Sequence, residues 1–209
     1  MHRHPTCQKS LARTSVRAIL EKSNVYKMSR KHKFCNPDGA YFVTFAVQNW
    51  VDVFTRNAYK NILVESLAYC QKHKGLEIFA WCIMSNHVHL IVRAKDSVGA
   101  DVSPVPYLLP NIFRDFKAFT SQAVQKAIRE NPQESRKEWL LPMFKNGQFW
   151  QSGNYPIELW TSKVIYQKLD YIHQNPVEEG WVYSPEQYVY SSAIDYADEK
   201  GLLDVIRIR

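Results

Sequence analysis

Two apolar runs that flank a polar pair of residues constrain this chain more than any other feature. Trp81–Met84 and His87–Val92 are the runs, and Ser85-Asn86 separates them. This pattern is typical of two antiparallel strands joined by a tight connection. Side chains alternate between the two faces of a strand. We therefore predict that one face of the second strand is core, filled by Val88, Leu90 and Val92.

The other face of the second strand carries two histidines. His87 and His89 are two residues apart, so both side chains point the same way, together with that of Ile91. Two neutral imidazoles held side by side can bind a divalent cation. Taken alone, a His-x-His pair is more simply explained as two histidines on a half-solvated sheet. A metal site needs further ligands from a second element.

The net charge of +7 at pH 7 indicates an acidic partner such as nucleic acid, but most of that charge is local. Residues 1–27 hold six Lys or Arg and one Glu, a net of +5, which leaves +2 for the rest of the 209 residues. The length suits one domain with additions. No apolar run approaches the roughly 20 residues of a membrane span.

Two further features bear on localisation. The cysteines (Cys7, Cys35, Cys70 and Cys82) have no CxxC spacing, so we expect reduced thiols in an intracellular protein. Residues 1–27 have the composition of a mitochondrial targeting peptide. A disordered basic arm, or an extension upstream of a natural start at Met28, explains that composition better.

The pattern along the chain predicts an α+β fold of the ferredoxin-like (RRM-like) type, in which an antiparallel sheet carries helices on one face. An additional C-terminal helix completes it. Residues 132–147 are expected to be a flexible excursion. The predicted elements are strands at 40–47, 76–84 and 87–92, an irregular strand within 148–159, and helices at 57–74, 111–130 and 162–174.

The last predicted helix brings three chemically useful side chains to a common face. Lys168, Tyr171 and Asn175 are spaced i, i+3 and i+7, and Asn175-Pro176 is expected to end the helix. A phenol, an amide oxygen and an ammonium together suit phosphoryl chemistry, as nucleophile, metal ligand and phosphate contact. The simpler alternative is a packing tyrosine followed by a common helix-ending dipeptide.

Taken together, the motifs resemble those of the single-tyrosine HUH transposases, and within them the REP-associated tyrosine transposases. The resemblance covers about residues 28–196. It is carried by four ordered segments, Asn86-His87-Val88-His89, Phe149-Trp150-Gln151, Asp170–Val177 and Tyr188–Ser192. Residues 1–27 and the proline-containing loop at 99–110 look like additions to the family pattern. Where relatives have a histidine after the Trp-Gln pair, this chain has Asn154-Tyr155-Pro156-Ile157.

The resemblance implies a chemistry and a set of roles. Mg²⁺ or Mn²⁺ would be bound by His87, His89 and Asn175. Tyr171 would attack the scissile phosphate of single-stranded DNA that carries a hairpin, giving a 5′-phosphotyrosine and a free 3′-hydroxyl. Another 3′-hydroxyl would reverse the step, so that strands are exchanged without hydrolysis. The catalytic domain would span 28–196, between the extension at 1–27 and a tail at 197–209.

The resemblance also implies a bacterial, cytoplasmic protein, associated with the nucleoid when bound to DNA, acting as a monomer or homodimer and without a membrane partner. Charge and position alone suggest phosphate contacts. The candidates are Arg30, Lys31, Lys33, Arg114, Lys117 and Lys168.

Two other function classes remain open from the sequence. One is a catalytically idle protein that binds DNA or RNA hairpins on the same fold, and it predicts affinity without a covalent adduct. The other is a metal-dependent hydrolase of small phosphoesters, which predicts activity independent of Tyr171. Hydrolases of that type usually recruit more carboxylates around their metals.

Overall fold

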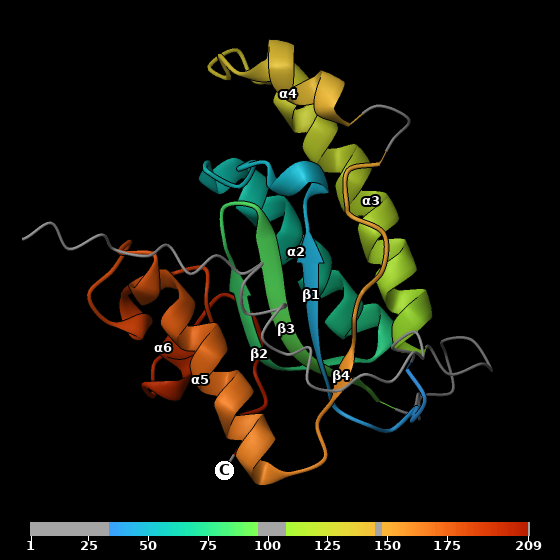
Figure 1. The fold of residues 1–209 in the computed structure, drawn as a ribbon, viewed down its shortest axis with the longest axis vertical. Coiled ribbons are helices and arrows are strands. Elements are labelled where there is room, and N and C mark those ends of the chain that lie inside the picture. Colours follow the sequence, from blue (N-terminus) through green and yellow to red (C-terminus); the bar gives the residue numbers. More distant parts are fainter. Residues whose placement is uncertain (1–33, 96–107, 145–147, 209) are drawn as a thin grey trace, which may run out of the picture. The chain divides into compact units, whose positions relative to one another are not determined.

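A four-stranded antiparallel sheet lies at the centre of the protein in the computed structural model, which describes residues 34–95, 108–144 and 148–208 (Figure 1). The strand order is β2-β3-β1-β4. The strands are β1 (Tyr41–Ala46), β2 (Leu76–Ile83), β3 (His87–Ala94) and β4 (Ile157–Glu158). With helices between β1 and β2 and between β3 and β4, this is the predicted ferredoxin-like arrangement.

Helices cover the two faces of the sheet. Helices α2 (Asn57–Lys74) and α3 (Leu109–Glu130) lie on one face. There, Phe45 packs against Phe113 of α3 with ring centroids 4.9 Å apart. Helix α5 (Ser162–Glu178) lies on the opposite face, against β2 and β3. Because side chains alternate along β1, Phe45 faces α3 while Phe42 faces α5.

The predicted hairpin is present. Strands β2 and β3 pair antiparallel, and the backbone N–H of Met84 donates to the carbonyl of His87 (2.8 Å) around Ser85-Asn86. The three predicted core residues of β3, Val88, Leu90 and Val92, are all fully buried. His89 lies opposite Thr44 of β1, which fixes the face on which the histidines lie.

The prediction of a flexible excursion at 132–147 is wrong for its described part. Helix α4 (Lys137–Met143) forms there, and the buried carboxylate of Glu134 fastens the segment to α2. Glu134 accepts hydrogen bonds from Arg56 Nε (3.0 Å), Tyr59 Oη (3.1 Å) and Arg136 Nε (2.9 Å). Residues 145–147 lie outside the described part of the chain.

The sequence predicted that α5 ends at Asn175-Pro176. The helix instead continues to Glu178. Pro176 removes one backbone donor but leaves the helical path intact. The residue that terminates the helix is Gly180, which has a φ of 73°. Its N–H donates to the carbonyl of Val177 (2.9 Å), and the N–H of Trp181 donates to that of Pro176 (2.9 Å), the pair of bonds of a Schellman motif.

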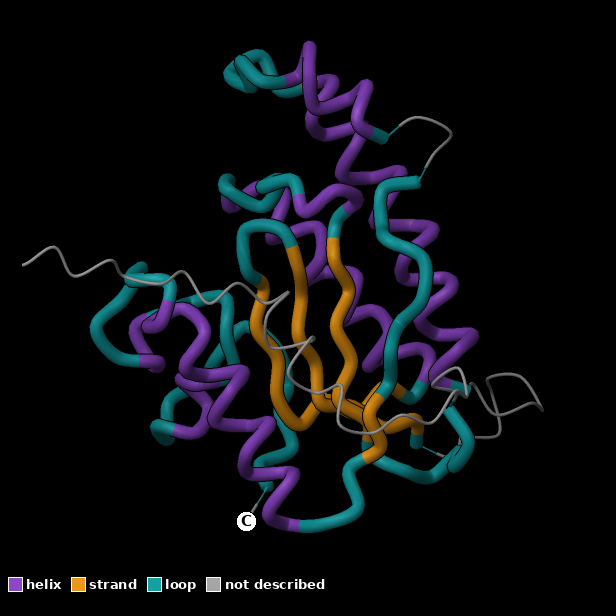
Figure 2. The backbone as a smooth tube through the Cα atoms, viewed as in Figure 1, coloured by secondary structure: helices purple, strands orange, loops and turns teal. Residues whose placement is uncertain are grey.

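The fourth strand is irregular, as predicted. Only two residues form β4, while the segment before it runs beside β1 as non-strand backbone (Figure 2). Trp150 forms an isolated bridge with Val47, and the N–H of Gln151 donates to the carbonyl of Ala46 (2.8 Å). The Phe149-Trp150-Gln151 motif is therefore held at the end of β1 that lies beside His87.

The last part of the chain packs along the free edge of β2. The N–H of Ile83 donates to the carbonyl of Tyr190, and the N–H of Ser192 donates to that of Trp81 (both 2.9 Å). Leu203 is buried, and the N–H of Ile206 donates to the carbonyl of Ile78 (2.9 Å), so residues of the predicted tail contact the sheet. The short helices of the fold are η1 (Gln48–Trp50), η3 (Pro185–Gln187) and α6 (Ala193–Tyr196).

Some predictions concern segments outside the described residues. The N-terminal extension at 1–27 is among them.

The described residues all belong to one unit, His32–Arg209. Within it the three cysteines are free thiols, of which Cys70 and Cys82 are buried. None of the described helices is long and apolar enough to cross a membrane.

Candidate active site

The two histidines of β3 lie side by side, with ring centroids 4.6 Å apart, and both are almost fully buried. One nitrogen of each ring is hydrogen-bonded: His87 Nδ1 lies 2.6 Å from Asn86 Oδ1, and His89 Nδ1 lies 2.8 Å from Thr44 Oγ1. The Nε2 atoms of both rings are buried and have no hydrogen-bond partner among the residues that the structure describes. An imidazole anchored through one nitrogen, with the other one unpartnered, has the arrangement of a metal ligand.

Burial keeps both histidines neutral. It lowers the pKa of His87 to about 4, an effect that the carboxylate of Asp52 partly opposes. Burial also lowers the pKa of His89 well below its usual value, and the neighbouring His87 and Lys168 add to that effect. A neutral imidazole is the form that binds a metal, so no proton has to be displaced at pH 7.

Tyr171 of α5 lies directly against this pair. Its ring centroid is 5.1 Å from that of His89 and 6.0 Å from that of Phe42. Phe42 in turn stacks on His89 at 5.5 Å. Burial raises the pKa of Tyr171, and the nearby side chain of Asn175 partly offsets this. The phenol is therefore neutral at pH 7, and using it as a nucleophile requires activation.

The other two residues of the predicted helix face lie in the same region of α5. The ammonium of Lys168 lies 4.7 Å from the ring centroid of Phe42 and 5.5 Å from that of Tyr171, and burial lowers its pKa. Asn175 is buried, and its Nδ2 donates to the carbonyl of Tyr171 (2.6 Å). In the described part of the chain no cluster of three His, Cys, Asp or Glu could hold a metal, so a third protein ligand needs another residue type.

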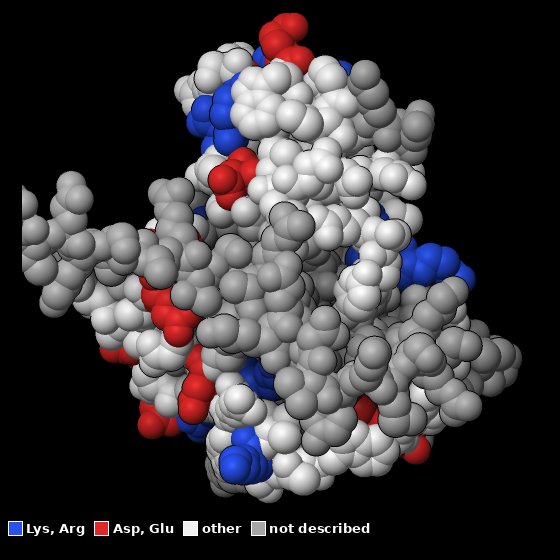
Figure 3. All heavy atoms as spheres, in the orientation of Figure 1, with Lys and Arg blue, Asp and Glu red and all other residues white. Residues whose placement is uncertain are grey.

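The predicted phosphate contacts occupy different environments. Arg30, Lys31 and Lys33 lie outside the described residues. Arg114 is exposed and paired with Asp115 (2.9 Å). Lys117 is half-buried, and its Nζ donates to Asn154 Oδ1 (2.6 Å) and to the carbonyls of Gly153 and Gln151. On the face drawn in Figure 3, the basic side chains of described residues form small, separate groups.

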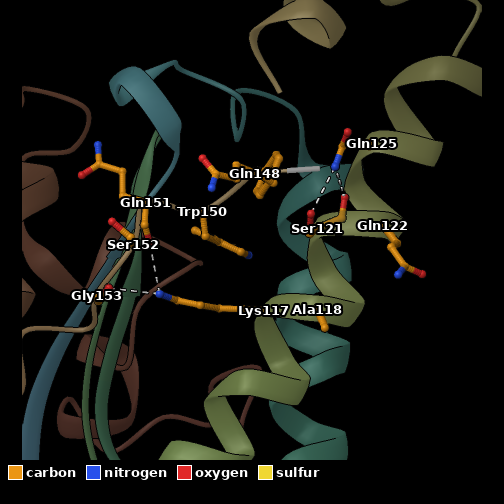
Figure 4. A pocket seen from close by; sticks show the side chains of 11 residues that line it. Lys117, Ala118, Ser121, Gln122, Gln125, Gln148, Trp150, Gln151, Ser152 and Gly153 are labelled. Atoms are coloured by element: carbon orange, nitrogen blue, oxygen red, sulfur yellow. Dashed lines mark hydrogen bonds between the residues drawn. The ribbon is translucent and has the colours of Figure 1, made fainter. Parts of the chain in front are cut away.

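A hollow of about 480 Å³ lies between α3 and the segment that contains the Phe149-Trp150-Gln151 motif. Its lining is mainly amide and hydroxyl side chains (Figure 4). Gln125 is bonded within its own helix to Ser121 (2.9 Å), and Lys117 crosses the hollow to the opposite backbone. Lys117 thereby ties α3 to the segment that follows Trp150.

Sequence reasoning missed several residues that hold the site in place. Asp52 accepts a hydrogen bond from Asn86 at the end of the hairpin, and Thr44 is hydrogen-bonded to His89. No sequence motif marks either residue. His173 lies on the buried side of α5, with Nε2 2.9 Å from the hydroxyl of Ser192. Since Ser192 pairs with Trp81 of β2, His173 fastens the helix that carries Tyr171 to the edge of the sheet.

We expect His173 to make the protein less stable in mild acid. Burial lowers its pKa to about 4 from 6.5, so the unfolded chain binds more protons as the pH falls below 6.5. The stability lost through this group is roughly 2 kcal/mol at pH 5 and is complete below pH 4. Urea unfolding at pH 7 and pH 5 measures this loss. His173→Phe retains His87 and His89 and should lose less stability than the parent between these pH values; equal losses would contradict the prediction.

Comparison with known proteins agrees with the geometry. The family model described as "Transposase IS200 like" matches residues 37–175. A Haemophilus influenzae protein named a REP-associated tyrosine transposase is 23% identical over 165 residues, which is 79% of this chain and 85% of that protein. The solved structure of a REP-associated tyrosine transposase bound to a REP hairpin superimposes with a TM-score of 0.58 at 18% identity, covering 87% of this chain and 94% of that one.

The family match spans the hairpin with both histidines and reaches Asn175 on α5. It therefore includes His87, His89, Lys168, Tyr171 and Asn175, the residues of the candidate site, but not Ser192. This chain belongs to the IS200-like transposase family, and it resembles the REP-associated tyrosine transposases, as its sequence motifs predicted.

Proposed function

We propose that this protein is a metal-dependent endonuclease and strand transferase that acts on single-stranded DNA next to a hairpin. One observation carries the proposal most directly. The ring of Tyr171 lies 5.1 Å from that of His89, whose buried Nε2 has no hydrogen-bond partner in the described part of the chain. A nucleophile therefore lies beside a pair of neutral nitrogen ligands. The related structure that contains a REP hairpin supports hairpin DNA as the substrate class.

The chain's own residues divide the work. His87 and His89 would hold Mg²⁺ or Mn²⁺ through Nε2, with Asn175 as a third ligand by analogy with the family. A bound divalent cation supplies charge stabilisation at the non-bridging phosphate oxygens. Lys168, whose ammonium lies 5.5 Å from the ring centroid of Tyr171, would supply a second positive charge to a phosphate bound there.

The covalent step is an exchange of one phosphodiester for another. Tyr171 Oη forms a bond to the scissile phosphorus and loses its proton, while the bond from phosphorus to the 3′ oxygen breaks and that oxygen gains a proton. The products are a 5′-phosphotyrosine and a 3′-hydroxyl. Attack by another 3′-hydroxyl reverses the exchange and releases Tyr171, so the strand-transfer cycle consumes no water.

Metal removal tests this proposal. Labelled single strands that contain a palindromic hairpin, drawn from the DNA on either side of the gene, should give a label-bearing band on a denaturing protein gel in Mg²⁺ or Mn²⁺. We expect EDTA to abolish the band and excess Mn²⁺ to restore it. We expect His89→Ala to lower adduct formation at least about 100-fold, because a ligand is removed.

The control for that variant is its melting temperature, since His89 is buried. A folded His89→Ala protein with undiminished adduct would contradict the role of His89. Tight binding of the hairpin with no adduct in either metal would instead identify a DNA-binding protein without catalytic activity.

A further inference from the structure

The hydrogen bond between His87 and Asn86 fixes which nitrogen of His87 carries the proton. Asn86 Oδ1 lies 2.6 Å from His87 Nδ1, and an amide oxygen can only accept. Nδ1 must therefore be the donor. Nε2, which is buried and has no hydrogen-bond partner within 34–95, 108–144 and 148–208, keeps its lone pair. The protonation pattern of His87 thus depends on the direction in which the Asn86 amide points.

Asp52 sets that direction. The amide nitrogen of Asn86 donates to Asp52 Oδ1 (2.9 Å) and to the carbonyl of Trp50 (3.2 Å). A flipped amide would place its oxygen against these two acceptors and its nitrogen against His87. The carboxylate allows only one orientation, because it has no proton to donate.

Asp52 is itself held in place from two sides. Ser85 Oγ donates to the same Oδ1 atom (2.6 Å), and Arg136 donates to the backbone carbonyl of Asp52 (2.9 Å). The N–H of Phe54 donates to the carbonyl of Ser85 (2.7 Å), which fastens this segment to the hairpin end. The Asp52 carboxylate is thus an immobilised acceptor for the hydrogen bond from the Asn86 amide.

The second histidine lacks such a device. His89 Nδ1 contacts the hydroxyl of Thr44 (2.8 Å), which can either donate or accept. That contact leaves both neutral tautomers of His89 possible. An effect of Asp52 should therefore be confined to His87, which provides an internal comparison within each sample.

We propose that Asp52 is a positioning residue that acts through the amide of Asn86 to hold His87 in its Nδ1–H tautomer, with the Nε2 lone pair presented to a divalent cation. The metal-binding part of this inference rests on the proposed function. The part that concerns the tautomer rests on the hydrogen bonds alone.

The test is a two-bond ¹H–¹⁵N correlation spectrum of metal-free protein with ¹⁵N-labelled histidine, in which protonated and unprotonated ring nitrogens have distinct shifts. His87→Gln identifies the signals of His87. We expect the parent protein to show Nδ1 protonated and Nε2 unprotonated at His87. In Asp52→Ala we expect a mixture of tautomers at His87 and unchanged His89 signals.

Affinity for Mn²⁺, measured by electron paramagnetic resonance without DNA, is the second readout. We expect Asp52→Ala to weaken it about 10-fold, the range typical of groups that orient a ligand. Asp52→Asn can present either its amide oxygen or its amide nitrogen to Asn86, so it should also give a mixture of tautomers at His87 and a weaker affinity. Ser85→Ala removes a bond to Asp52 but leaves the one from Asn86, so it serves as the matched control.

Two results would overturn the proposal. One is a parent protein in which His87 carries its proton on Nε2, a measurement that needs no variant. The other is a folded Asp52→Ala protein with the parent tautomer and Mn²⁺ affinity. Neither depends on DNA cleavage, so an inactive parent protein would refute the proposed function and leave this test valid.

Discussion

Tyr171→Phe should abolish the covalent protein–DNA adduct, with a loss of at least about 1,000-fold, because the variant lacks the hydroxyl that forms the phosphotyrosine bond in the proposed reaction. The ring contacts with His89 and Phe42 involve carbon atoms that phenylalanine retains. The variant should therefore fold, bind hairpin DNA and bind Mn²⁺ as the parent does. The measurement is the amount of label retained on the protein in a denaturing gel.

Tyr166→Phe is the matched control. Tyr166 is on the same helix and is exposed, so its hydroxyl can be removed without altering the site. It should form as much adduct as the parent. An adduct that persists in Tyr171→Phe would show that another nucleophile acts, and cleavage without any adduct would indicate attack by water.

Among the proposed substitutions, Glu134→Ala should cause the largest loss of folding stability, about 3–5 kcal/mol. The reason is that Arg56, Arg136 and Tyr59 lose the buried acceptor that they share. The Arg136 hydrogen bonds lead in lowering the pKa of Glu134 to about 2. Its contribution is therefore present above about pH 4.5 and is lost as the pH falls through 2. Urea unfolding at pH 7 measures the difference.

Glu130→Ala is the comparison for that variant. Glu130 is exposed on α3 and faces Lys126 at 3.9 Å, so its removal should change stability by less than about 0.5 kcal/mol. If Glu134→Ala were as mild as Glu130→Ala, the segment at 132–144 would not depend on the buried carboxylate.

Local patterns in the sequence predicted those parts of the site that depend on regular geometry. Strand alternation placed His87 and His89 on one face, and helical spacing placed Lys168 and Tyr171 on another. That the two faces meet could not follow from either pattern alone. It came from the family resemblance, and the contact of Tyr171 with His89 agrees with it.

One wrong prediction concerns a segment, 132–144, whose structure depends on distant partners. The first part of this segment, 132–138, is polar and charged, yet Glu134 is buried because Arg56 and Tyr59, far away in the sequence, surround it. The second wrong prediction, an end of α5 at Asn175-Pro176, has a local cause, because the capping bonds at Gly180 end the helix instead. Asp52 could not have been found, since only the fold brings it to Asn86.

Because the C-terminal segment pairs with β2, the site can be completed only late in the synthesis of the chain. A nascent chain that has reached Asn175 already contains His87, His89 and Tyr171. It still lacks Ser192, which bonds to His173 of α5 and to Trp81 of β2. During synthesis, β3 with its two histidines is therefore present before Ser192 can fasten α5 beside it. A chain that a premature stop codon ends before Ser192 would never gain that link.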